Sequence, residues 1–275
     1  MFDTPYRWRF AILACLFAAF AAAPVAAQSD GLEATIAAAH RTPVNVARDR
    51  YRHPLETLRF FGIEPDMTVV EIWPGGGVWY MQILAPYLKD RGHYIAAGFP
   101  RDTQSKFLRR INARIDALIS DHADLYGAVA LTEFGPGRYD IAPPGSADMV
   151  LTFRNVHNWL KGGYAADAFV AFYRALKPGG VLGLVEHRAD PAKPEDPQAL
   201  SGYTHESQVL RLAEGAGFRL VARSEVNANP RDTRDHPNGV WTLPPVRRGD
   251  DANNDRYMAI GESDRMTLKF VKPAE

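Results

Sequence analysis

Cysteine is almost absent from the sequence, since Cys15 is the only one among 275 residues. It lies in an N-terminal stretch that we expect to be removed from the mature protein. The remaining chain then has neither a disulfide nor a reactive thiolate, and its stability has to come from packing.

An excess of charge of either sign is also absent. The chain has 32 Lys and Arg residues and 32 Asp and Glu residues, which leaves no formal net charge at pH 7. Proteins that bind nucleic acids or anionic membranes over a broad surface usually have a basic excess. The charge balance therefore argues against nucleic acid as a partner.

Long apolar runs are confined to the N-terminus. The stretch 10–23 has about 14 residues, whereas a membrane-spanning helix needs about 20. Arg7 and Arg9 precede this stretch, and Val25–Ala27 supplies the small residues that signal peptidase recognises. We predict a cleavable signal peptide at residues 1–27, no stable membrane insertion, and a periplasmic or secreted protein. An uncut N-terminal anchor is the alternative.

Two common phosphate-binding motifs are missing from the glycine-rich stretch Thr68–Leu88, TVVEIWPGGGVWYMQILAPYL. It has neither the Lys-Ser/Thr of a P-loop nor the dinucleotide spacing G-x-G-x-x-G. Its β-branched residues predict a strand, Pro74–Gly77 a turn, and the apolar residues after it a helix. Glycines let main-chain N–H groups approach a ligand, so the turn suits a nucleotide-like or carboxylate-bearing molecule. An ordinary tight connection is the alternative.

Strand and helix patterns alternate along the chain. We expect strands at residues 68–72, 93–97, 128–132, 148–153, 181–186, 218–226 and 266–271, and later helices at 103–120, 164–176 and 207–216. A helical segment at about 31–62 precedes them, a turn is expected at 177–180, and a polar loop at about 227–255. The alternation predicts an α/β fold with a doubly wound, mostly parallel sheet, in a single domain over residues 28–275.

A charged run, Arg48–His53, lies within the N-terminal helical segment. A solvated charged face explains it, and so does a lid on the substrate side of the sheet's ligand-binding edge.

Several motifs in order resemble a known family. VVEIWPGGG, DMVLTFRNVHNW, ALKPGGVLGLVEHRA, AGFRLV and GESDRMTLKF are similar to segments of class I S-adenosylmethionine-dependent methyltransferases, and to an exported bacterial group of predicted methyltransferases. The resemblance covers roughly residues 55–273. It implies a seven-stranded, Rossmann-like methyltransferase fold with an antiparallel last strand. The implied cofactor is S-adenosylmethionine, bound above the first, second and fourth strands.

The resemblance also implies roles around the glycine turn. Glu71 matches the acidic residue that helps to hold the ammonium group of the cofactor, and Gly75 and Gly77 match the second and third glycines of the motif. Trp73 stands where the first glycine is usual, which narrows the space for the ligand, and Gly76 is available to compensate. An indole of Trp73 that filled this hollow would exclude the cofactor.

A second departure concerns the ribose. The family usually has an acidic residue at the end of the second strand, whereas this chain has Ala97–Phe99, and Asp102 is the nearest carboxylate. Glu133 matches the region that meets the adenine amino group. The segment that lines the cofactor beside the fourth strand matches Phe153, Arg154 and Asn155.

Methyl transfer to an oxygen or nitrogen of high pKa requires a proton acceptor. His157, on the family's acceptor side, is our first candidate for this proton acceptor, and a structural role in the loop is the alternative. Glu186 and His187 together are candidates for a proton-transfer pair, and a structural role is again the alternative. His205 is a further candidate. These four residues offer metal ligands in principle, but without H-E-x-x-H or comparable spacing we expect no metal.

We therefore predict a methyltransferase that uses S-adenosylmethionine and acts on a small or medium-sized acceptor. The Asn-Pro-Pro-Tyr-type element of nucleic acid base methylases is absent, which again argues against nucleic acid. Export separates the protein from a cytosolic cofactor, and the ribose acid is missing, so a non-catalytic ligand-binding protein with this fold is the alternative. A nicotinamide-dependent enzyme fits less well because its fingerprint is absent.

Overall fold

The computed structural model describes Met1, residues 26–249 and residues 254–274. Apart from Met1, Ala26 and Ala27, the predicted signal peptide lies outside the described residues, so its cleavage stays a prediction. Among the described residues, no helix has both the length and the apolar composition needed to cross a membrane.

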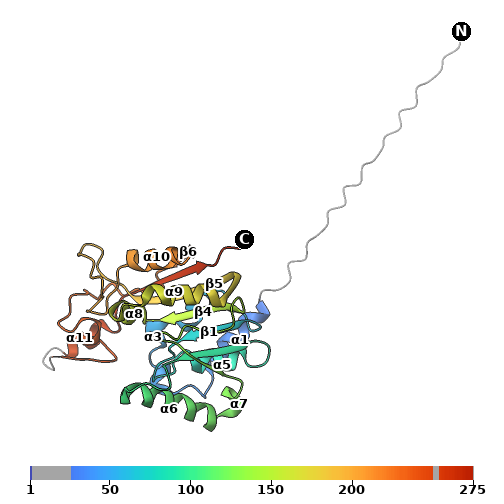
Figure 1. Ribbon diagram of the computed structural model, residues 1–275, viewed down its shortest axis with the longest axis horizontal. Coiled ribbons are helices and arrows are strands. Elements are labelled where there is room, and N and C mark those ends of the chain that lie inside the picture. The colour runs from blue at the N-terminus through green and yellow to red at the C-terminus, as the bar shows by residue number, and fades with distance from the viewer. Residues whose placement is uncertain (2–25, 250–253, 275) are drawn as a thin grey trace.

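A seven-stranded sheet forms the centre of the molecule, with strand order β3-β2-β1-β4-β5-β7-β6 (Figure 1). Strands β1 to β5 pair in parallel, whereas β7 is antiparallel to both β5 and β6. This confirms the predicted fold class and the antiparallel last strand. The strands are β1 (Thr68–Ile72), β2 (His93–Gly98), β3 (Ala130–Glu133), β4 (Ala147–Phe153), β5 (Leu176–His187), β6 (Arg219–Ser224) and β7 (Arg265–Val271).

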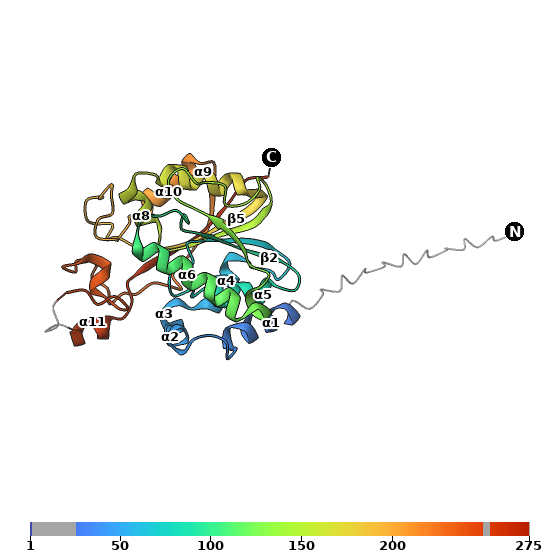
Figure 2. The same cartoon turned by 60° about the horizontal axis from the view of Figure 1, so that its bottom comes forward.

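Helices cover both faces of the sheet (Figure 2). Side chains alternate along each strand, so Val69 packs with the apolar cluster on one face, and Val70 and Ile72 pack with the cluster on the other. The first face is covered by α1 (Ala26–Ala37), α4 (Pro54–Phe61), α5 (Met81–Leu88), α6 (Lys106–Asp121) and α7 (Ala123–Tyr126). The second is covered by α8 (Val156–Gly162), α9 (Ala165–Ala175) and α10 (Glu206–Gly215).

The N-terminal segment crosses the ligand-binding edge of the sheet. Two short helices, α2 (Pro43–Val46) and α3 (Asp49–Arg52), precede α4, which begins at Pro54 and ends where Gly62 adopts φ 82°. Arg52 is only 3% exposed, and Arg48 pairs with the buried carboxylate of Glu262. The charged run is therefore not a solvated face.

The connection into β5 differs from the predicted turn. Residues 177–180 belong to the strand, which begins at Leu176 because this residue pairs with Ala147 across an irregularity in β4. Gly179 adopts φ 79°, and its N–H donates to the carbonyl oxygen of Lys272 at 2.8 Å. The glycine thus bends the strand instead of ending it.

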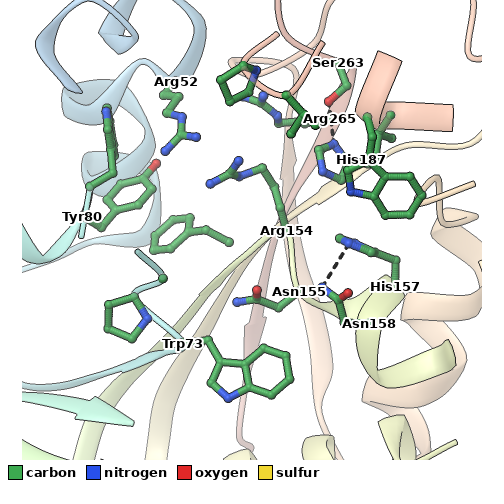
Figure 3. Close-up of a pocket in the computed structure, with 18 of the residues that line it drawn as sticks. Arg52, Trp73, Tyr80, Arg154, Asn155, His157, Asn158, His187, Ser263 and Arg265 are labelled. Atoms are coloured by element: carbon green, nitrogen blue, oxygen red, sulfur yellow. Dashed lines mark hydrogen bonds between the residues drawn. The ribbon is translucent and has the colours of Figure 1, made fainter. Parts of the chain in front are cut away.

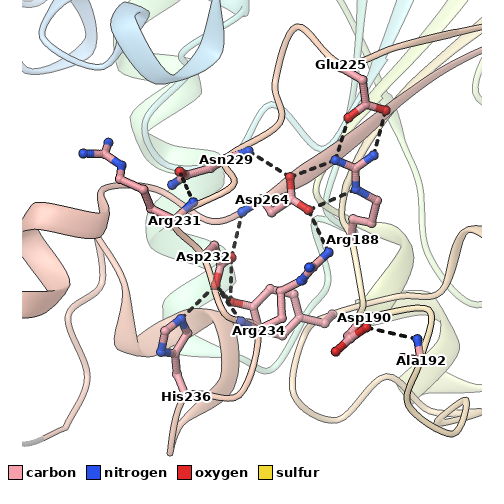
Figure 4. A network of polar contacts seen from close by, with 11 residues as sticks. Arg188, Asp190, Ala192, Glu225, Asn229, Arg231, Asp232, Arg234, His236 and Asp264 are labelled. Carbon is pink, nitrogen blue, oxygen red and sulfur yellow. Dashed lines mark hydrogen bonds and ion pairs between the residues drawn. The ribbon is translucent and has the colours of Figure 1, made fainter.

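The expected loop after β6 contains a 3-10 helix, η1 (Gly239–Thr242), and leads into α11 (Asn254–Ile260). Polar side chains hold it to the sheet (Figure 4). Asp264, just before β7, accepts from Arg188 at the end of β5 and from the N–H of Asn229. Asp232 accepts from His236 at 2.8 Å and from the N–H of Asp264 at 2.7 Å. These contacts place residues 240–246 over the carboxyl ends of the strands.

Candidate functional site

A cavity of about 280 Å³ lies at the carboxyl ends of β1, β4 and β5, where the strand order reverses (Figure 3). Its wall is formed by the glycine turn, the segment after β4, α3, the start of β7 and the loop after β6. The residues that line it are Arg52, Glu71, Trp73, Pro74, Gly75, Trp79, Tyr80, Phe153, Arg154, Asn155, His157, Asn158, His187, Val240, Trp241, Pro244, Pro245, Val246, Ser263 and Arg265.

His157 and Glu186 form a buried pair beside this cavity. The His157 Nδ1 atom lies 3.0 Å from Oε1 of Glu186, which is fully buried at the end of β5. The same carboxylate accepts from the N–H of Val156 at 2.6 Å and of His187 at 2.7 Å, so it also fixes the start of α8. An Nδ1–H that donates to Glu186 leaves Nε2 as the basic atom of the ring.

Among the residues that the structure describes, the Nε2 atom of His157 has one partner, the side-chain amide of Asn158 at 3.1 Å. Asn158 lies on the surface and lines the cavity, so a ligand can replace it at this nitrogen.

His187 stands next to this pair and has a different hydrogen-bond partner. Its Nδ1 atom lies 2.5 Å from the hydroxyl of Ser263, and its ring centroid is 5.4 Å from that of His157. Burial, and after it the charges of His157 and Arg265, hold the pKa of His187 well below the ordinary value. His187 is therefore neutral at neutral pH and contributes to the cavity wall without charge.

Guanidinium groups dominate the opposite side of the cavity. Glu262 accepts from Arg48 at 2.6 Å, from Arg52 at 3.4 Å and also from Arg265. Burial alone would raise the pKa of this carboxyl group, but the three guanidinium charges hold it well below the ordinary value. One ionised carboxylate thus faces three cations.

Arg154 adds a fourth cation to the cavity wall. Its backbone adopts φ 64°, and its N–H donates to the carbonyl oxygen of Val185 at 2.7 Å. Within the described part of the chain, its guanidinium makes no hydrogen bond or ion pair, and Figure 3 shows it near the middle of the cavity. Burial and the charge of Arg265 lower its pKa to about 10. The cavity is therefore strongly electropositive.

Trp73 forms the wall of the cavity on the other side. It adopts φ 51° in place of the usual glycine, and its indole N–H donates to the carbonyl oxygen of Phe134 at 2.9 Å. The ring centroid lies 4.5 Å from that of Phe99 and 5.7 Å from that of Phe134. These neighbours follow β2 and β3, where the resemblance places ribose and adenine. The indole of Trp73 thus lies at the border between the central cavity and the region expected for the nucleoside.

Glu71 lines the cavity but is not free to hold a cation. It is 3% exposed and accepts from the hydroxyl of Tyr94 at 2.5 Å. Burial raises its pKa to about 8, so the carboxyl group is mostly protonated at neutral pH. Of the glycines, only Gly75 lines the cavity, whereas an added Cβ would meet Ile111 at Gly76 and Asn45 at Gly77.

Asp102 and Glu133 do not line the cavity. Both pair with Arg138 on the surface, and Glu133 also accepts from the N–H of Arg101 at 3.1 Å. A second cavity of about 700 Å³ lies beyond Trp73 and is mostly apolar. Both cavities are lined by Trp73, Asn155 and Asn158.

The structure brings together three metal-type ligands that sequence spacing did not reveal. One ligand atom each from His157, Glu186 and His187 lies within 4.8 Å of the others. Two features disfavour a cation here: the carboxylate already accepts from the ring and main-chain N–H groups, and Arg154 and Arg265 lie nearby. The expectation of no metal stays a prediction.

His205 is not part of the site. It begins α10, where its N–H donates to the side chain of Gln208 at 3.0 Å, and it lines a separate cavity with Arg188.

Sequence patterns missed several lining residues. Arg52 belongs to the charged run Arg48–His53 and Arg265 to the segment GESDRMTLKF, whereas Trp241 lies in a segment without a distinctive pattern.

No family model and no curated protein matches the chain. Solved structures do. An S-adenosylmethionine-dependent methyltransferase from Aquifex aeolicus is 16% identical over 89% of this chain and 98% of its own, with a TM-score of 0.54. The [4+2]-cyclase SpnF is 16% identical over 80% of this chain and 79% of its own, also with a TM-score of 0.54. These similarities establish the class I methyltransferase fold.

Proposed function

We propose that this protein is an enzyme that removes a proton from a small molecule in the central cavity, with His157 as the general base. The observation that supports this most is the contact of 3.0 Å between His157 Nδ1 and the buried Glu186. The carboxylate orients the ring and stabilises the imidazolium that forms when Nε2 takes up a proton. Glu186 is thus a positioning residue.

S-adenosylmethionine does not fit the residues as they stand. At the methionine end, an added Cβ on Gly75 would meet nothing closer than the carbonyl oxygen of Trp73 at 3.9 Å. Toward the adenosine end, the indole of Trp73 stands between the central cavity and the second, mostly apolar cavity, and Asp102 and Glu133 pair with Arg138. We therefore propose proton transfer without this cofactor.

A methyltransferase that uses S-adenosylmethionine, with an unidentified small or medium-sized acceptor, is the second candidate. The second cavity beyond Trp73 favours it, because displacement of the indole would join about 280 Å³ to about 700 Å³. In that case His157 would remove the acceptor's proton. The fold does not decide between the candidates, since one fold neighbour is named a methyltransferase and another a cyclase.

Calorimetry on residues 28–275 with S-adenosylmethionine and S-adenosylhomocysteine distinguishes the two candidate functions. We expect no binding to the wild type and measurable binding to Trp73→Gly. Trp73→Phe keeps an aromatic ring at this position and should not bind either compound. Binding to the wild type would overturn the cofactor-free proposal in favour of the second candidate. Absence of binding to a folded Trp73→Gly would remove the second candidate.

The general base is tested by turnover. A small-molecule extract in D₂O is incubated with the wild type, with His157→Gln and with His93→Gln, a control at an exposed histidine. Mass spectrometry should show consumed or deuterated compounds with the wild type and the control, and none with His157→Gln. The same changes with His157→Gln would refute the assignment. No change with any variant would favour a non-catalytic ligand-binding protein.

We further propose a periplasmic or secreted location for the mature protein. The support is the N-terminal sequence alone: Arg7 and Arg9, an apolar stretch and small residues before Gln28. Cell fractionation with N-terminal sequencing tests this, and a protein that keeps residues 1–27 in the membrane fraction would contradict it.

A further inference from the structure

The charges around the central cavity do not balance. The side chains of Arg52 and Arg265 are 4% and 3% exposed, and the only ionised carboxylate that they contact among the described residues, Glu262, is shared with Arg48. Arg154 has no ionised partner among the described residues, and Glu71 is mostly protonated. Buried cations without counter-ions are costly, and such an arrangement is typical of a site that receives an anion.

Hydrogen-bond donors in the cluster are also left without acceptors. Nη2 of Arg52 and Nε of Arg265 are buried and have no partner among the described residues. The guanidinium of Arg154 also makes no hydrogen bond within that part of the chain, while its backbone is held in the left-handed region at φ 64°. Buried donors are nearly always satisfied in proteins, and planar guanidinium groups match the oxygens of carboxylates and phosphates.

The cluster is held in place by its neighbours. The guanidinium carbon of Arg52 lies 4.8 Å from the ring centroid of Trp79, and the ring of Tyr80 stacks on that of Phe153 at 3.5 Å. Burial raises the pKa of Tyr80, so its hydroxyl remains a donor next to the cluster. Figure 3 shows Tyr80 and Arg52 on one side of Arg154, and Arg265 on the other.

We propose that the molecule bound in this cavity has an oxyanion group, a carboxylate or a phosphoryl group, which binds Arg154 together with Arg52 and Arg265. Arg154 lies three residues before His157, and both line the cavity, so an anion seated on the arginines leaves the rest of a small molecule next to the imidazole. This inference names the class of substrate for the proposed function. It depends on the proposed function only for the role of His157.

Titration of small anions tests the proposal. Sodium acetate, sodium phosphate and uncharged acetamide, which has the shape of acetate, are added to residues 28–275 at constant ionic strength. Calorimetry and tryptophan fluorescence report binding, since Trp73, Trp79 and Trp241 line the cavity. We expect saturable binding of at least one anion and none of acetamide. Acetate alone would indicate a carboxylate, and phosphate alone a phosphoryl group.

Variants identify the site. Arg154→Gln should weaken anion binding at least tenfold, and Arg154→Lys, which keeps the charge but not the planar fork, should weaken it less. Arg101→Gln is the matched control, because Arg101 pairs with Asp116 on the surface. Failure of both anions to bind the wild type, or equal binding to a folded Arg154→Gln, would overturn the proposal.

His157→Gln separates this inference from the proposed function. It should bind the anions as the wild type does, because the oxyanion contacts the arginines and not the imidazole. Anion binding with no turnover in any variant would leave this inference standing while the general-base proposal fails.

Discussion

Replacement of Arg154 by glutamine is expected to stabilise the ligand-free protein, although most substitutions at buried positions destabilise. The pKa of Arg154 is lowered from 12.5 to about 10, because burial and Arg265 disfavour its charged form. Each tenfold change in a protonation constant corresponds to about 1.4 kcal/mol. The buried charge of Arg154 therefore lowers the free energy of unfolding by up to about 3 kcal/mol. Because the side chain lies on a cavity wall, where solvent screens the charge, we expect about 2 kcal/mol.

The lowered pKa of Arg154 determines how its contribution to stability depends on pH. The folded state disfavours the proton on Arg154 relative to the unfolded state, so the cost is fully present below pH 10 and is relieved as the pH rises from about 10 to 12.5. Glutamine is neutral at every pH and accepts the same backbone conformation at a similar cost. At neutral pH the variant should therefore be the more stable protein.

Denaturant and thermal unfolding at pH 7 measure the difference. A gain of about 2 kcal/mol corresponds to an increase in Tm of about 4–8 °C for a domain of this size. Arg154→Lys keeps the cation and should show no such gain. An anion that binds the wild type should narrow the gap, since it stabilises only the protein that binds it. A loss of more than about 1 kcal/mol in Arg154→Gln would refute the view that this charge is unpaired.

Further predictions concern buried carboxylates. The pKa of Glu71 is raised to about 8 from 4.5, so its folded form keeps a proton that the unfolded chain releases. Wild-type stability should fall between pH 4.5 and 8 by up to about 1.4 kcal/mol per pH unit, and Glu71→Gln should lose this part of the dependence in unfolding curves. Asp232→Ala should cost about 3 kcal/mol, because His236 and main-chain N–H groups lose their acceptor; unchanged stability would contradict the network. Glu186→Gln should lower turnover by about 10- to 100-fold while ligand binding persists, since it weakens the orientation of His157; equal loss of both would indicate a structural role only.

Local patterns were sufficient for the architecture. Most strands of the parallel core are short runs of β-branched or apolar residues, and side chains alternate between two faces, so period and spacing identify these strands without knowledge of their neighbours. The same local argument placed the glycine turn with Gly75 at the carboxyl edge, and the family resemblance placed Arg154 and His157 there; the cavity lies at this edge. The local argument placed the start of β5 too late, because the strand's first pairing partner, Ala147, lies across an irregularity.

The character of the site was decided by contacts between residues far apart in the chain. Arg52 and Glu262 are separated by 210 positions, and no pattern near either one indicates that they meet. The direction of the Trp73 indole depends on Phe99 and on the carbonyl oxygen of Phe134, so the sequence revealed the missing glycine but not which space its replacement fills. Secondary structure follows from local periodicity, whereas charge balance and free volume in a cavity depend on which distant side chains the fold brings together.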